Sequence, residues 1–196
     1  SIAPLLRYFA KSYSIAGGEK KKVQRLKRLR VTSHSFSDVR AIFDSPNRLG
    51  VSKAKKEYVK ALRQAKKHVI FFSPYYVPDQ QFLRALWFAR KRGVRVDILL
   101  PLRSDLRLLT HVAYAYFALM ERLGVHVHLT EQMLHGKGVV VDDTWAMIGS
   151  SNIDETSFRD NYEANIKIKN RHVVRQIKKA VTKWLHGSIA FDREDR

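Results

Sequence analysis

The chain has 196 residues, a length that fits one domain or one domain with an appendage and allows a full hydrophobic core. It contains no cysteine, which excludes a disulfide scaffold and leaves the redox environment open. The formal net charge is +19, from 37 Lys plus Arg against 18 Asp plus Glu, and such an excess attracts polyanions such as nucleic acid or an anionic lipid surface.

Residues 1–36 are predicted to form a basic connector or appendage. Within them, the segment 20–30 (KKKVQRLKRLR) holds seven basic residues and no acidic one. Val23, Leu26 and Leu29 recur every three residues, which gives a narrow apolar stripe if the segment is helical. A basic amphipathic helix suits a membrane interface or a nucleic-acid backbone, and a solvated connector is the alternative.

From about residue 37 the chain alternates between strand-like and helix-like segments. Apolar runs bounded by turn residues predict strands at 38–43, 68–73, 94–101 and 125–129. Helical periodicity predicts helices over 52–67, 80–93 and 104–124, with Ser52 as an N-cap and Gly93 and Gly124 as C-terminal caps. Strands that alternate with helices favour a mostly parallel sheet covered on both faces.

The alternation of strands and helices ends in the last third of the chain. HGKGVVV (135–141) and WAMIG (145–149) are separated by three residues, too short a connection for anything but a hairpin. A strand over 163–169 and a basic helix over 172–187 follow. The predicted fold class of residues 37–196 is therefore α/β, with a mixed, mostly parallel sheet flanked by helices on both faces.

No unbroken apolar run reaches the roughly 18 residues that a spanning helix requires. The best stretch is VAYAYFALM (112–120), so we expect the chain not to cross a membrane. The chain starts with Ser1 rather than Met, and its first residues lack the basic leader and long apolar centre of a signal peptide. These features favour a fragment of a longer protein.

The stretch LHGKGVVVDDTWAMIGSSNID (134–154) contains the residues best suited to catalysis or ligand binding. Alternate residues of a strand share a face, so His135 and Lys137 project side by side. The hairpin can bring Ser150 and Asn152 back alongside the start of the strand, where they add a hydroxyl and an amide. Every one of these groups can bind an anionic oxygen.

This set of groups suits chemistry on a phosphodiester. Attack on a tetrahedral anion requires a nucleophile that is neutral near pH 7 and donors that stabilise the developing negative charge. Histidine, with a reference pKa of about 6.5, meets the first demand. Lys137, Ser150 and Asn152 meet the second, and a covalent phosphohistidine at His135 splits the displacement into two easier steps. The mechanism needs no metal and no other cofactor.

The spacing of these residues resembles the signature of a known family. Four residues separate Lys137 from Asp142, and six separate Asp142 from Gly149. The whole set resembles the full signature of the phospholipase D superfamily: His135, Lys137, Asp142, Gly149, Ser150 and Asn152. The resemblance covers about residues 37–187, and three segments resemble bacterial cardiolipin synthases in particular: 73–79 (SPYYVPD), 142–154 (DDTWAMIGSSNID) and 161–166 (NYEANI).

The resemblance implies a role for each residue of the motif. The signature histidine attacks phosphorus and the lysine and asparagine hold the phosphate, whereas Asp142 and Gly149 belong to the motif's structure. Glu163 fits a carboxylate that family members place behind the nucleophilic histidine to orient its ring. A surface charge at the end of a strand is the alternative for Glu163.

The superfamily's active site pairs two such motifs, and this chain has one. Either a second chain supplies the other half across a twofold axis, or residues 37–196 are the phospholipase D-like domain of the C-terminal half of a two-motif synthase. Ser1 and the connector-like residues 1–36 favour the second option.

The resemblance implies a phosphatidyltransferase that makes cardiolipin or a related product from anionic phospholipids, or a phospholipase if water is the acceptor. It also implies peripheral association with the cytoplasmic membrane of a bacterium. Tyr75, Tyr76, Val77 and the apolar face of the helix over 104–124 are candidates to line an acyl-chain groove, with core packing as the alternative for the helix.

Two other functions stay open. The first is a single-motif, dimeric phosphodiesterase or nuclease that acts on nucleic acid, which the positive charge would serve equally well. The second is a non-catalytic half that binds anionic surfaces. The sequence leaves open the donor lipid, the acceptor alcohol, the balance between transfer and hydrolysis, the oligomeric state and the activity of this chain alone.

Overall fold

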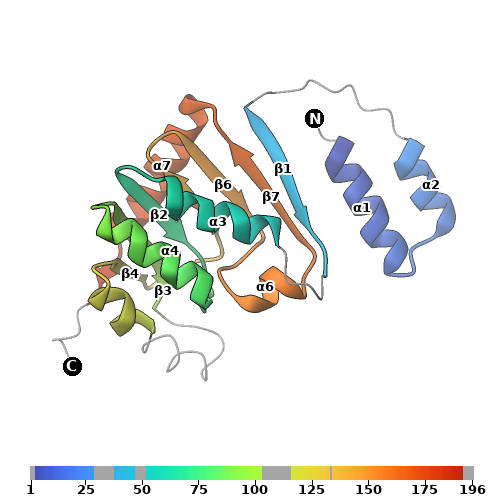
Figure 1. The fold of residues 1–196 in the computed structure, drawn as a ribbon. Helices are drawn as coiled ribbons and strands as arrows, with labels where there is room; N and C mark the ends of the chain where they lie inside the picture. The colour runs from blue at the N-terminus through green and yellow to red at the C-terminus, as the bar shows by residue number, and fades with distance from the viewer. Residues whose placement is uncertain (1–2, 29–37, 47–51, 103–115, 133, 192–196) are drawn as a thin grey trace.

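The computed structural model describes residues 3–28, 38–46, 52–102, 116–132 and 134–191 (Figure 1). The strands are β1 (Val39–Asp44), β2 (His68–Phe72), β3 (Arg95–Pro101), β4 (His126–Thr130), β5 (Lys137–Val141), β6 (Trp145–Gly149), β7 (Glu163–Ile168) and β8 (Ile189–Ala190). The helices are α1 (Ala3–Ile15), α2 (Lys20–Arg28), α3 (Lys53–Gln64), α4 (Gln80–Lys91), α6 (Glu155–Arg159) and α7 (Arg171–His186). All the named strands form one sheet.

The sheet is mixed, in the order β1-β7-β6-β5-β2-β3-β4-β8. Only β2 with β3 and β3 with β4 pair in parallel, and the other neighbours pair antiparallel. The predicted mixed α/β class is confirmed, but the expectation that most of the sheet is parallel is wrong. The parallel part comes from strand–helix–strand units, whereas the short β5–β6 connection permits antiparallel pairing alone.

The caps predicted from the sequence are present. The backbone N–H of Lys55 donates to Ser52 Oγ over 3.0 Å, so Ser52 is the N-cap of α3. Gly93 and Gly124 have positive φ angles of 78° and 72°, as expected for residues that end helices. Of the helix predicted over 104–124, residues 104–115 lie outside the described residues, and 116–122 are helical.

Two apolar layers hold the helices on the sheet. Successive side chains of β2 point to opposite faces, so Phe71 joins the layer under α3 and α4, whereas Phe72 joins the layer under α7. Tyr58 of α3 and Phe82 of α4 are fully buried in the first layer. Figure 1 shows α3 and α4 on one face of the sheet and α7 on the other. The expected coverage of both faces is confirmed.

The first helix, α1, lies beside the edge strand β1, and α2 packs against α1 (Figure 1). The ring of Tyr8 on α1 stacks on Phe43 of β1 with centroids 4.4 Å apart, and its hydroxyl donates to the carbonyl of Asp44. The basic run predicted as helical corresponds to α2, in which Val23 is buried. The division of the chain at residues 36 and 37 stays a prediction. Within the described residues, no helix combines the length and apolar character of a membrane span.

Candidate active site

The β5–β6 hairpin brings the motif together. Lys137 pairs with Gly149 in the register of the two strands, so the residues after Gly149 lie beside the start of β5. Asp142 and Asp143 turn the chain with positive φ angles of 48° and 58°, which Asp tolerates better than most residues. The predicted hairpin is confirmed.

His135 and Lys137 are in direct contact at the start of β5. Lys137 Nζ lies 3.1 Å from His135 Nε2 and donates to the carbonyl of His135 over 2.8 Å. An ammonium group has donors and no acceptor, so Nε2 accepts at this contact and carries a lone pair. The imidazole of His135 is exposed, so a ligand can reach the ring from solvent.

Lys137 is largely withdrawn from solvent, with 8% of its surface exposed. Burial lowers the pKa of its ammonium group, because a charged amine loses hydration, and the negative charge of Glu163 partly opposes that effect. A desolvated ammonium interacts more strongly with an incoming anion than one in bulk water. Lys137 thus provides a positive charge at the nitrogen of His135.

Ser150 and Glu163 form the second contact of the cluster. The Ser150 hydroxyl donates to the carboxylate of Glu163, which is buried, and accepts from the backbone N–H of Ala164 over 2.9 Å. Glu163 contacts Ser150 here, and the ring of His135 contacts Lys137. The orienting role of Glu163 and the phosphate-binding role of Ser150 stay predictions.

Asn152 lies in the same loop as Ser150 and has an unpaired polar atom. Its Oδ1 atom is buried and has no hydrogen-bond partner among the described residues. Its backbone N–H donates to Ser157 Oγ over 3.2 Å, which fixes the main chain but leaves the amide group available. A buried polar atom without a partner calls for an explanation, and a ligand at this position is one.

Three residues that the sequence interpretation missed hold the loop in place. Asn165 of β7 donates from Nδ2 to Ser151 Oγ over 2.8 Å, Tyr58 donates its hydroxyl to the Ser151 carbonyl over 2.9 Å, and Ser73 Oγ accepts from the N–H of Ile153. Asn165 alternates with Glu163 and Lys167 along one face of β7, and all three are buried, so a polar row on one face of the strand was the signal in the sequence. The partners of Tyr58 and Ser73 carry no local signal.

Asp142 and Gly149 contribute through the backbone. The carboxylate of Asp142 accepts the N–H groups of Lys66, Lys67 and His68 over 2.7–2.8 Å, so it joins the hairpin turn to the start of β2. Burial would raise the pKa of Asp142, but these hydrogen bonds outweigh it and lower the pKa. A Cβ atom at Gly149 would overlap with Asn165. Neither residue contributes a side chain to the His135–Lys137 contact.

The acyl-chain groove expected at Tyr75, Tyr76 and Val77 is not supported at Tyr76. The ring of Tyr76 is 4% exposed, packs edge-on against Phe82, and donates its hydroxyl to the sulfur of Met120 over 3.3 Å. Burial raises the pKa of Tyr76. Tyr76 is therefore a core residue and does not line a groove.

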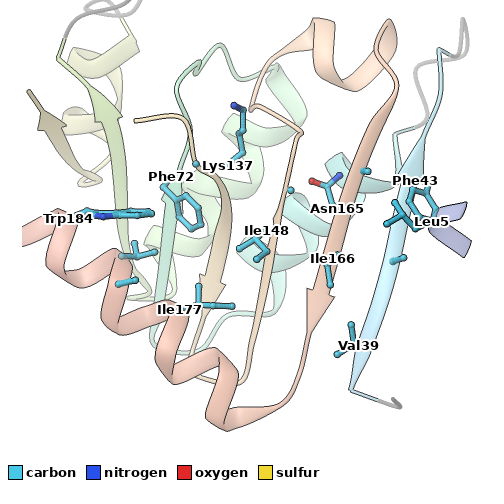
Figure 2. A pocket seen from close by; sticks show the side chains of 16 residues that line it. Leu5, Val39, Phe43, Phe72, Lys137, Ile148, Asn165, Ile166, Ile177 and Trp184 are labelled. Atoms are coloured by element: carbon cyan, nitrogen blue, oxygen red, sulfur yellow. The ribbon is translucent and has the colours of Figure 1, made fainter. Parts of the chain in front are cut away.

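A different apolar cavity of about 780 Å³ opens on the α7 face of the sheet (Figure 2). Gly136, Lys137 and Gly149 form its end at the candidate site, and Ile148, Ile166 and Trp184 are among its apolar walls. Figure 2 shows Ile148 and Ile166 between Trp184 of α7 and Val39 of β1. Within the described residues, no group of three or more His, Asp or Glu side chains is arranged to hold a metal ion.

These features define a mixed α/β protein with an exposed histidine in contact with a buried lysine at the start of β5, and an asparagine with an unpaired amide oxygen in the loop after β6. Residues 58–185 match the family model described as "Cardiolipin synthase, PLD-like domain". The chain belongs to this family of the phospholipase D superfamily, and the resemblance inferred from the motif is confirmed.

Curated relatives agree with the family. The chain is 36% identical over 132 residues to a cardiolipin synthase of Clostridium perfringens, covering 67% of this chain and 28% of that protein. It is 36% identical over 138 residues to cardiolipin synthase B of Escherichia coli, covering 70% of this chain and 32% of that protein. The chain thus matches about a third of the length of these relatives.

Solved structures share the fold at low sequence identity. Nuc of Salmonella typhimurium, a phospholipase D family member, superposes with a TM-score of 0.65 at 19% identity, covering 78% of this chain and 97% of that chain. A phosphatidylserine synthase of Haemophilus influenzae superposes with a TM-score of 0.64 at 14% identity, covering 88% of this chain and 46% of that chain. These similarities support the α/β fold alone.

Proposed function

We propose that this chain supplies one half of a phosphatidyl-transfer site, in which His135 attacks the phosphorus of an anionic phospholipid. The single observation that carries the proposal is the contact between His135 Nε2 and Lys137 Nζ. It holds a nitrogen lone pair beside a buried positive charge, on an imidazole open to solvent. A nucleophile and a charge-stabilising donor are the two elements that phosphodiester displacement needs.

The proposed reaction proceeds in two displacements. The lone pair of Nε2 forms an N–P bond while the P–O bond to the leaving alcohol breaks, and a proton from an acid on the other half moves to that oxygen. The hydroxyl of an acceptor lipid or alcohol then attacks the phosphohistidine, gives its proton back to that base and releases His135. Lys137 Nζ and Asn152 Nδ2 donate to the non-bridging oxygens, on which negative charge accumulates.

The described residues offer one such histidine cluster, so the acid that protonates the leaving group must come from a second motif. We propose that it comes from another part of a longer protein, as the length of the curated relatives suggests, or from a second copy of the chain. Either source must place its histidine opposite His135 across the phosphate.

Anionic phospholipids and cardiolipin synthesis are the proposed substrate class and pathway, on the strength of the relatives' names. The net charge of +19 favours an anionic membrane surface, and α2 concentrates part of it in six basic residues without an acidic one. We propose peripheral association with the cytoplasmic membrane.

A nuclease-like phosphodiesterase is the second candidate, and the same net charge favours it. The test compares headgroup transfer from anionic vesicles with nicking of DNA in one buffer, using the form that contains both halves of the site. We expect lipid turnover that rises when an alcohol acceptor is added, and DNA binding that weakens with salt without cleavage. Cleavage of DNA with no lipid turnover would assign the protein to nucleic acid instead.

A further inference from the structure

The helices α3 and α4 present an outer surface that the proposed reaction does not use. The two helices pack side by side on one face of the sheet (Figure 1). Alternate side chains of β5 point to the same face, so Lys137 lies with Val139 and Val141 on the face that these helices cover. The outer surface of α3 and α4 is therefore on the side of the sheet to which the Lys137 side chain points.

Two large aromatic side chains are exposed on the outer surface of α4. Trp87 is 39% exposed and Phe88 is 53% exposed, and their ring centroids lie 4.8 Å apart. The core side of the same helix is formed by other residues, which are buried: Phe82, Ala85, Leu86 and Ala89. The folded chain thus leaves much of both rings in water, which is unfavourable unless another apolar phase covers them.

Cationic side chains surround this aromatic pair. Glu57 is the one acidic residue within α3 and α4, and it is buried and bonded to Lys167 and Arg40. Lys91 Nζ lies 3.9 Å from the centroid of the Trp87 ring. The exposed cations of the two helices are Lys53, Lys56, Lys60, Arg63, Arg84 and Lys91. These two helices, both described in full, therefore expose positive charge and no carboxylate of their own.

We propose that the outer surface of α3 and α4, which we call the aromatic–basic face, docks on an anionic bilayer. Surface cations are attracted to anionic headgroups, and Trp and Phe are favoured at the boundary between headgroups and acyl chains. A bilayer thus provides both phases that this face requires, negative charge outside and hydrocarbon beneath. The inference rests on the proposed function for its lipid surface and adds the face of the fold that meets it.

Single-stranded nucleic acid is the other polyanion that binds cations together with aromatic side chains. Stacking of bases needs an open ring face, whereas Lys91 covers one face of Trp87. The rings of Trp87 and Phe88 also meet edge to face, so they form no continuous platform for bases. The pair is therefore better suited to insertion among lipid chains.

The N-terminal helices offer a matched comparison. α2 is basic, but its Val23 is buried and its Leu26 is half-buried, so α2 attracts an anionic surface through charge alone. Phe9 of α1 is 53% exposed, the same fraction as Phe88. However, α1 lies beside β1 at one edge of the sheet, whereas α4 packs over β3 toward the other edge (Figure 1). Phe9→Ala is therefore the control for Phe88→Ala.

Vesicle flotation tests the proposal, with the form of the protein that contains both halves of the site and with varied ratios of phosphatidylglycerol to phosphatidylcholine. We expect Phe88→Ala to weaken binding about tenfold, since a half-exposed phenyl ring loses its apolar phase, and Phe9→Ala to change it by less than about twofold. Arg84→Ala should weaken binding about fivefold at low salt. Arg175→Ala, on the exposed side of α7, is the control for the loss of one arginine charge.

Insertion of the aromatic pair also has a spectroscopic signature. Bromine on the acyl chains quenches tryptophan at short range alone, so vesicles of brominated lipid should quench Trp87. The quenching should be largely lost in Trp87→Phe and kept in Trp184→Phe, because Trp184 lines the cavity on the opposite face of the sheet. Equal quenching in the two variants would place another part of the protein at the membrane and overturn the proposal.

Turnover separates failure of this proposal from failure of the proposed function. Phe88→Ala should slow turnover of vesicle lipid and leave turnover of monomeric, short-chain lipid unchanged. Weakened vesicle binding in Phe88→Ala with no lipid turnover by any form would support the docking face and contradict the proposed function. Equal vesicle binding by the wild type and Phe88→Ala would overturn the docking face alone.

Two further outcomes would assign the aromatic–basic face to a different partner. A loss of affinity for single-stranded DNA in Phe88→Ala that matches its loss for vesicles would assign the face to nucleic acid. Self-association without lipid, seen by sedimentation and abolished by Phe88→Ala, would assign it to a second copy of the chain. Either result would overturn the proposal.

Discussion

Two histidine clusters of the same sheet differ in burial and in hydrogen bonding. At the start of β2 and β3, the fully buried carboxylate of Asp97 accepts hydrogen bonds from His68 over 2.6 Å, His128 over 2.7 Å and Arg95 over 2.8 Å. At the start of β5, His135 is exposed and contacts Lys137, with no carboxylate bonded to its ring among the described residues.

The difference teaches which polar groups are available for chemistry. Burial alone would raise the pKa of Asp97, but its hydrogen bonds from His128, His68 and Arg95 hold the pKa below the ordinary range of a carboxyl group. Every partner in that cluster is used within the protein, which is typical of a structural network. The ring of His135 contacts only Lys137 among the described residues, and Asn152 Oδ1 in the loop after β6 has no partner there, so these groups remain available to a ligand.

Removal of the His135 imidazole should have the largest effect on activity. We expect His135→Ala to reduce lipid turnover by roughly 10⁴-fold or more, because no other described side chain supplies the nucleophile. Its folding stability should change by less than about 0.5 kcal/mol, since the side chain is exposed. Turnover and thermal unfolding are measured together, with His186→Ala on the exposed end of α7 as the control that should keep full activity. Substantial residual turnover in His135→Ala would mean that His135 is not the nucleophile, and the two clusters would then not differ in function.

Loss of the buried ammonium should come next. Lys137→Ala should lower kcat by roughly 10²–10³-fold, as expected when one donor to a developing oxyanion is removed. Because burial lowers the pKa of Lys137, the alkaline fall of activity should begin below the ordinary lysine value, and Lys137→Arg should move it to higher pH. The pH profile of kcat checks this, and Lys179→Ala is the control for loss of a surface charge. An alkaline limb that is identical in the wild type and Lys137→Arg would contradict the assignment.

Asp97→Asn should destabilise the fold by about 3 kcal/mol and leave the specific activity of the folded protein intact. The pKa of Asp97 is lowered in the folded state, so its stabilisation is fully present above the unfolded value of about 3.9 and is lost as the pH falls toward the folded value. The wild type should therefore lose its advantage over Asp97→Asn below about pH 4. Urea unfolding at several pH values measures this, and a constant difference down to pH 2 would be inconsistent with the network.

The smallest expected effect concerns the aspartate of the motif itself. Asp142→Ala should lower the free energy of unfolding by about 1–3 kcal/mol, because three backbone N–H groups lose their acceptor. Once corrected for the folded fraction, kcat should stay within a few-fold of the wild type. Activity lost in a fully folded Asp142→Ala protein would mean that Asp142 acts in the chemistry.

More of the candidate site than of the surrounding fold could be predicted from the sequence. His135, Lys137 and the residues after Gly149 follow from a strand and a tight hairpin, because both are local in sequence. The Asp97 cluster could not be predicted, since its histidines lie 29 and 31 residues away along the chain. The apolar cavity on the α7 face combines residues from α1 to α7, and the antiparallel majority of the sheet depends on which strands become neighbours. Such long-range pairings leave no periodic signal in the sequence.

The most direct test of the central claim is capture of the covalent intermediate. The form that contains both halves of the site is mixed with phosphatidylglycerol labelled at phosphorus, quenched in alkali, digested and analysed by mass spectrometry. The N–P bond of a phosphohistidine is labile in acid, so an acid-quenched sample serves as a second control. The account predicts a phosphatidyl group on the peptide that carries His135, its disappearance after acid treatment and its absence from His135→Ala. A label on any other side chain while turnover proceeds, or turnover with no labelled protein under conditions that trap a short-lived adduct, would contradict it.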